Sequence, residues 1–195
     1  MKLQAQSVLD GTFGSVNPVS RFKSQKAALK ELSDTGCVLF TVASHRDDAV
    51  HSVSNAAGVE LPVGPGEIKT AVGRAALWLS PRSWLIQCRI EDEPLLVTRL
   101  NAVFPDKLAH AVPFTDALCW FELSGEAALD LLTEGSFISL ERGGLPVGHA
   151  KRTLIAQIAA VVIRQSENVW QVAVERSRSK YFVDWLSAAA GESSE

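Results

Sequence analysis

The 195-residue sequence contains few cysteines and no cysteine motif. Cys37, Cys88 and Cys119 each lie in an apolar stretch, without a CxxC pair or the spacing of a metal site. The odd number and the missing disulfide framework favour buried free thiols in a reducing compartment. We therefore expect a cytoplasmic protein.

Long apolar runs and an excess of basic charge are also missing. No run approaches the ~18 apolar residues of a membrane span, and residues 1–16 lack the apolar core of a secretory signal. The formal net charge of −3 argues against a general nucleic-acid binder, which carries a strong basic excess. The hydrophobic content of 47% and the five tryptophans instead predict a packed core that needs no metal or disulfide.

The stretch 152–189 carries the strongest structural signal. Leu154–Ile163 is almost entirely apolar and predicts one long strand, followed by a polar turn at 165–168 and a half-buried strand at 169–175. The last segment predicts a helix, because its apolar residues fall on one face: Tyr181, Phe182, Trp185, Leu186 and Ala189.

Earlier parts of the chain alternate between helix and strand signals. Ser24 predicts the N-cap of a helix through Leu32, and Ser124 predicts the N-cap of a helix that Gly135 ends. Between them the sequence predicts strands at 37–43, 108–112 and 117–123, helices beginning at Asp47 and Glu91, a Pro/Gly loop at 61–66 and a hairpin turning at 81–83.

This order predicts an α+β fold. Residues 37–112 give the order strand, helix, two strands, helix and strand, which is one split β-α-β unit. The second half of the chain repeats this order. We expect two such split β-α-β units with antiparallel sheets and helices packed on them. The predicted organisation is an extended arm at 1–23, a single domain at 24–190 and a disordered tail at 191–195.

The arm offers candidate partner-interface residues. Leu9, Phe13 and Val16 are apolar but belong to no predicted regular element. Two interpretations stay open. The arm docks on a neighbouring subunit, or its apolar residues fold back on their own domain.

Polar candidates for chemistry are weak. Asp47 and His51, four residues apart and close to His45, would share a helix face but lack a third metal ligand at compatible spacing, so no metal site is predicted. A basic, glycine-bearing loop before the long strand is a weak candidate for binding an anion such as a phosphate or a polyglutamate tail; its basic residues are Arg142, His149, Lys151 and Arg152. The loop lacks the phosphate-loop pattern, and such loops are more often plain turns. The sequence predicts no catalytic residues.

Several short motifs occur in a characteristic order. They are Leu61-Pro62 with Gly64-Pro65, ALWLSPRSWLIQC around Trp78 and Trp84, FELSGEAALDLL at 121–132, Arg152-Thr153, Arg164, Arg176-Ser177 and Trp185-Leu186. In this order the chain resembles the gamma subunit of heterotetrameric sarcosine oxidase over 61–189. That family in turn resembles the folate-binding domain of the glycine-cleavage T-protein, an aminomethyltransferase.

The resemblance implies a role in a complex. It suggests a non-catalytic assembly subunit with alpha, beta and delta partners, in an enzyme that oxidatively demethylates sarcosine or a related N-methyl amino acid to glycine, formaldehyde or methylene-tetrahydrofolate, and hydrogen peroxide. FAD, FMN, NAD, tetrahydrofolate and zinc are expected on the other subunits, and none on this chain alone. The alternative is a stand-alone folate-binding or aminomethyltransferase-like protein.

Overall fold

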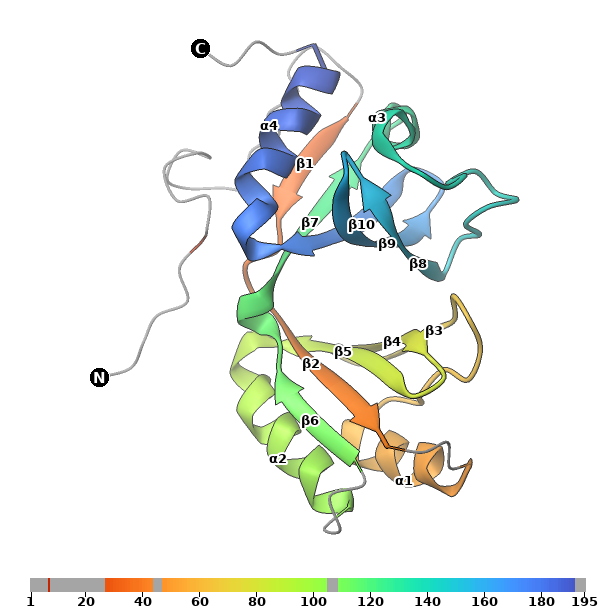
Figure 1. Cartoon of the computed structure of the whole chain (residues 1–195), viewed down its shortest axis with the longest axis vertical. Helices are drawn as coiled ribbons and strands as arrows, with labels where there is room; N and C mark the ends of the chain where they lie inside the picture. The colour runs from red at the N-terminus through yellow and green to blue at the C-terminus, as the bar shows by residue number, and fades with distance from the viewer. Residues whose placement is uncertain (1–6, 8–26, 44–46, 105–108, 192–195) are drawn as a thin grey trace. The chain divides into compact units, whose positions relative to one another are not determined.

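The computed structural model describes residues 7, 27–43, 47–104 and 109–191, and gives only the backbone of 47–49. The chain divides into two compact units, each with its own sheet and core (Figure 1). Unit 2 comprises Asp34–Asp116, and unit 1 holds the chain before and after it. The sequence predicts one domain over 24–190, whereas these two units each bury a separate apolar cluster.

Unit 2 has a five-stranded antiparallel sheet in the order β3-β4-β5-β2-β6. Its elements are β2 Thr35–Val42, α1 Asp47–Ala57, β3 Ile68–Ala71, β4 Arg74–Ser80, β5 Ser83–Arg89, a 3-10 turn at Ile90–Asp92, α2 Glu93–Val103 and β6 Ala109–Pro113. Helix α2 packs on α1, β2 and β6. The predicted strands, helices and hairpin of this region are confirmed, and β3 is an addition.

Unit 1 also has five antiparallel strands, in the order β1-β7-β10-β9-β8. Its elements are β1 Ala28–Glu31, β7 Leu118–Ser124, α3 Ala128–Gly135, β8 His149–Ile155, β9 Ile158–Ser166, β10 Val169–Glu175 and α4 Ser179–Ala189, with 3-10 turns at Thr115–Ala117 and Arg176–Arg178 before β7 and α4. Phe121, Trp170 and Phe182 are among the fully buried side chains of its core.

The two units repeat one topology. Strands β2, β4, β5 and β6 of unit 2 have the order of a split β-α-β fold, and β7, β9, β10 and β1 take the same places in unit 1. Each unit adds one edge strand, β3 or β8. The predicted α+β class and its duplication are thus confirmed. In unit 1 the place of β6 is taken by β1, which comes before β7 in the sequence and not after the last helix.

The prediction of a helix from Ser24 through Leu32 is wrong at β1. Residues 28–31 form β1, which pairs with β7 and buries Leu29 in the core of unit 1. The residues favour a helix locally, but pairing with the edge of β7 outweighs this weak preference. The predicted cap, Ser24, lies outside the described residues.

The prediction of one long strand at 154–163 is also wrong, because these residues belong to the two strands of a hairpin. Strands β8 and β9 meet at Ala156 and Gln157, whose φ angles are +51° and +65°. Two successive left-handed residues make the tight turn whose twist matches paired strands. Neither residue is Gly, Asn or Asp, so the usual turn signal is missing from the sequence.

Two smaller differences concern helix ends and faces. Ser124 ends β7 and does not cap α3, which begins after Ala127 without a side-chain cap. In α4, Phe182 and Leu186 are buried as predicted, but Tyr181 is 54% exposed. The apolar face of α4 is therefore narrower than the sequence suggests.

The β8–β9 turn gives a test of backbone strain. We expect Gln157→Gly to raise the free energy of unfolding by about 0.5–1 kcal/mol, because glycine adopts a positive φ without steric cost. Lys151→Gly is the control, since this residue is exposed in the regularly paired strand β8 and should gain nothing. Urea unfolding midpoints measure both. Equal shifts for the two variants would contradict the prediction.

Candidate functional site

Arg164 organises the loop before β8, which carries Arg142. The other three predicted anion-binding residues, His149, Lys151 and Arg152, lie on strand β8 and not in the loop that the sequence predicts. Arg164 lies near the end of β9, with only 2% of its surface exposed. Its Nη1 donates to the carbonyl oxygens of Leu145 at 3.1 Å and Leu140 at 3.5 Å, and its guanidinium lies 4.9 Å from the centre of the Trp170 ring. This buried cation therefore holds the loop against the core of unit 1.

Glu167 supplies the compensating negative charge. Its carboxylate accepts from Arg142 Nη2 at 2.7 Å and from Arg164 Nη2 at 2.9 Å. These bonds, that from Arg142 foremost, hold the pKa of the Glu167 carboxyl below its usual range. The group thus stabilises the fold above the ordinary glutamate pKa, and this contribution is lost as the pH falls through the lowered value.

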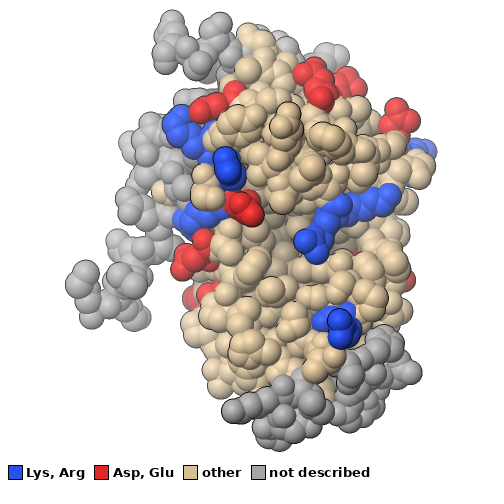
Figure 2. All heavy atoms as spheres, in the orientation of Figure 1, with Lys and Arg blue, Asp and Glu red and all other residues tan. Residues whose placement is uncertain are grey.

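The four predicted anion-binding residues do not share one environment. Arg142 is paired with Glu167, and His149 Nδ1 lies 3.2 Å from the Val147 carbonyl oxygen. Lys151 and Arg152 are exposed neighbours on β8, so their side chains leave opposite faces of the strand. On the face in Figure 2, basic side chains form separate groups among uncharged surface. Anion binding by this loop stays a prediction.

Two other groups of predicted residues fall largely outside the described residues. Leu9, Phe13 and Val16 are among them, so their partner contacts also stay a prediction. His45 is outside as well. Among the residues that the structure does describe, no group of three or more His, Cys, Asp and Glu side chains gathers at a possible metal site.

The cysteine thiols are buried, as predicted, and none forms a disulfide. Burial raises the pKa of the Cys88 thiol to about 11. Burial also raises the pKa of the Cys119 thiol to about 12, helped by the Glu31 carboxylate, whose Oε1 lies 3.5 Å from Sγ. Both sulfurs stay protonated at neutral pH and are poor nucleophiles.

This protonation predicts slow chemical modification. At pH 8 we expect iodoacetamide to label Cys88 and Cys119 at least ~100-fold more slowly in the folded chain than in urea. A pKa raised by two units lowers the fraction of reactive thiolate by about this factor, and burial also blocks access of the reagent. Peptide mass spectrometry measures each site. The labelling rate should rise with pH up to the raised pKa values. Labelling of Cys119 at the unfolded rate would show that the thiol is accessible.

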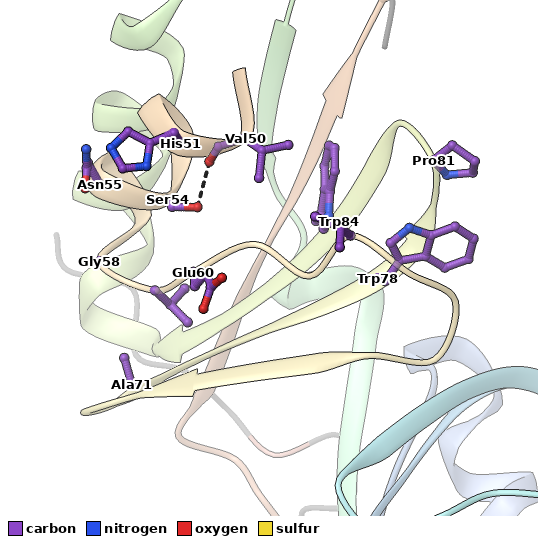
Figure 3. Close-up of a pocket in the computed structure, with 12 residues that line it drawn as sticks. Val50, His51, Ser54, Asn55, Gly58, Glu60, Ala71, Trp78, Pro81 and Trp84 are labelled. Atoms are coloured by element: carbon purple, nitrogen blue, oxygen red, sulfur yellow. Dashed lines mark hydrogen bonds between the residues drawn. The ribbon is translucent and has the colours of Figure 1, made fainter. Parts of the chain in front are cut away.

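A groove in unit 2 is a second candidate binding site. Its volume is about 850 Å³, and it lies between α1, the loop after it and the β4–β5 hairpin (Figure 3). Most of its lining is apolar and comes from Val50, Val59, Val63, Trp78, Pro81 and Trp84. The sequence predicts the hairpin and the loop, but no pattern in it indicates that their side chains line one groove.

The floor of the groove is firmly held. Trp78 and Trp84 are cross-strand partners on β4 and β5. Trp84 also packs against Phe40, with ring centres 6.0 Å apart, and its Nε1 donates to the Pro62 carbonyl oxygen at 2.8 Å. Ser54 Oγ accepts from the Leu61 amide at 2.9 Å, which fixes the other end of the loop to α1.

The polar groups of the groove are few. His51, Ser54, Asn55 and Glu60 lie along its α1 side, and Figure 3 shows Ser54 turned to the Val50 carbonyl oxygen, which it contacts at 2.6 Å. Glu60, whose side chain is largely exposed, pairs with the half-buried Lys69 at 3.9 Å. None of the lining residues that the structure describes is a lysine or arginine. The arrangement suits binding of an apolar group and contains no nucleophile paired with a base.

None of the helices in the described part of the chain has the length and apolar character needed to cross a bilayer.

Known proteins provide matches in both sequence and fold. The sarcosine oxidase subunits gamma of Corynebacterium sp. strains U-96 and P-1 are each 28% identical over 142 residues, covering 72% of this chain and 68% and 69% of theirs. A chain of the heterotetrameric sarcosine oxidase from strain U-96, solved with pyrrole 2-carboxylate, aligns with a TM-score of 0.77 and 23% identity over 87% of both chains.

A more distant match confirms the predicted fold relationship. The glycine cleavage system aminomethyltransferase T from Bartonella henselae aligns with a TM-score of 0.59 and 12% identity, over 85% of this chain and 46% of that protein. The family described as "Sarcosine oxidase, gamma subunit family" matches residues 43–192. The chain therefore belongs to the sarcosine oxidase gamma subunit family.

Proposed function

We propose that this chain is the non-catalytic assembly subunit of a multisubunit, flavin-dependent sarcosine oxidase. The family match over residues 43–192 carries the proposal. The described site supports it, because the groove of unit 2 is an apolar binding surface and the charged groups of unit 1 are used to fasten a loop. A subunit of this kind contributes surface and shape to a complex.

The proposed partners are alpha, beta and delta subunits. The complex would oxidise sarcosine or a related N-methyl amino acid, with FAD, FMN, NAD, tetrahydrofolate and zinc bound by those partners. We place it in the cytoplasm, and the buried Cys37, Cys88 and Cys119, which form no disulfide, support this, since buried reduced thiols are usual in reducing compartments.

A second candidate function is a stand-alone folate-binding or aminomethyltransferase-like protein. The fold shared with aminomethyltransferase T favours it. Fold alone does not assign a ligand, so this candidate is the weaker of the two.

One pair of measurements separates the candidates. The tagged chain is expressed with the alpha, beta and delta subunits of its own organism, and in parallel the chain alone is titrated with tetrahydrofolate by calorimetry. We expect a stoichiometric complex with sarcosine oxidase activity and no heat of binding to the isolated chain. Micromolar folate binding together with failure to assemble would support the stand-alone protein.

A further inference from the structure

We propose that the groove between α1 and the β4–β5 hairpin is a docking site for a partner subunit, and that its occupant is a segment with an apolar anchor beside a basic residue. This inference rests on the proposed function, since it assumes that the chain assembles with other subunits. It adds the surface that is used and the chemistry of the segment that fills it.

Exposed apolar residues surround the groove. Val63 on its rim is 73% exposed, and Val72, between β3 and β4, is fully exposed. Trp78 is half-buried, and no hydrogen bond to its indole N–H is found among the described residues. Tryptophans of this kind are enriched at the centres of protein interfaces, where their rings are covered and their N–H finds an acceptor.

The shape of the groove suits a protein segment. A volume of about 850 Å³ lies within the range of pockets that hold compounds much larger than one side chain. The walls need little rearrangement, because Trp84 is bonded to Pro62 and packed on Phe40. Such a preformed surface avoids the ordering cost that weakens association.

Charge selects the occupant. Among the lining residues that the structure describes, Glu60 is the one Asp or Glu, and none is Lys or Arg. An acidic segment would meet the like charge of Glu60, whereas a basic residue can replace Lys69 beside it. The existing pair is easily exchanged, since its atoms are 3.9 Å apart and the Glu60 side chain is 73% exposed.

Photocrosslinking in the assembled complex identifies the occupant. A benzophenone amino acid replaces Val63 in the full-length chain, and in a second protein it replaces Leu95, which is 52% exposed on α2 of the same unit but does not line the groove. We expect light to join position 63, and not position 95, to one partner subunit at an apolar segment that contains Lys or Arg. Crosslinks from position 63 to a second copy of this chain would overturn the proposal.

Substitutions measure the strength of the contact. We expect Val63→Glu to weaken capture by the partner subunits at least ~10-fold, and Leu95→Glu less than twofold, because only the first puts a charge into the buried contact. Glu60→Lys should also weaken capture, with a loss that shrinks in 0.5 M salt as the charges are screened. Circular dichroism confirms that each variant is folded.

Failure of this inference is distinct from failure of the proposed function. If the unsubstituted chain assembles and Val63→Glu is captured as well as Leu95→Glu, the groove is not an interface, although the subunit role holds. If the unsubstituted chain assembles with no partner subunit, the proposed function itself is wrong.

Discussion

Replacing Arg164 with alanine is expected to lower the free energy of unfolding by about 3–5 kcal/mol, or the melting temperature by roughly 6–20 °C. The guanidinium is buried and serves the carbonyls of Leu140 and Leu145, the Glu167 carboxylate and the Trp170 ring. Its removal leaves two carbonyl groups without this donor and a void beside the tryptophan. Each buried polar group left unpaired costs about 1–3 kcal/mol.

Arg142→Ala is the matched control. It removes a second arginine from the same carboxylate, but this side chain is 79% exposed, so we expect a loss below about 1 kcal/mol. Arg164→Lys should fall between the two, because it keeps the charge but loses the forked donors. Urea unfolding followed by tryptophan fluorescence measures all three. If Arg164→Ala costs no more than Arg142→Ala, the buried contacts contribute little to stability.

The ion pairs of Glu167 with Arg142 and Arg164 also predict pH dependence. The lowered pKa of Glu167 means that the folded chain loses this stabilising contribution only when the pH falls below the ordinary glutamate range. Glu167→Gln should therefore remove part of the acid sensitivity of unfolding. Its midpoint should change less between pH 6 and pH 3 than that of the unsubstituted chain.

Local pattern was enough to predict most helices and strands. Helix α1 begins at Asp47 and ends before Gly58, whose φ is +68°, so both its ends carry ordinary signals. Pro94 in its first turn likewise signals helix α2, and the turn residues near Pro81 signal the β4–β5 hairpin. Such elements are decided by residues next to one another in the chain.

The missed features depend on contacts that a sequence pattern does not contain. Strand β1 exists because β7 offers it an edge, and the β8–β9 turn uses Ala156 and Gln157 in place of Gly or Asn. Arg164 at the end of an apolar strand was a usable signal, because a buried cation requires a partner. That partner, Glu167, was only three residues away.

The origin of β1 predicts a large effect of chain order on folding. Unit 1 without residues 27–33 would expose the edge of β7 and lose Leu29 from its core. Burial of one leucine contributes about 1.5–3 kcal/mol, a large share of the 5–15 kcal/mol that stabilises an ordinary domain. We therefore expect residues 117–191 expressed alone to lack a cooperative unfolding transition.

Moving β1 to the other end should restore the fold. Strands β1 and β10 both pair antiparallel with β7, so they run in the same direction. Helix α4 follows β10 and ends at the end of the unit where β1 begins, as Figure 1 shows. A permuted chain of residues 117–191, a short Gly/Ser linker and residues 27–33 then has the same strand and helix order as unit 2.

We expect this permuted chain to unfold cooperatively in urea, with dispersed amide signals in its NMR spectrum. Leu29→Asp in the permuted chain is the control. It places a charge at a buried core position of β1 and should abolish the unfolding transition. A folded fragment 117–191 without β1, or a permuted chain that stays unfolded, would show that unit 1 depends on more of the chain than its fourth strand.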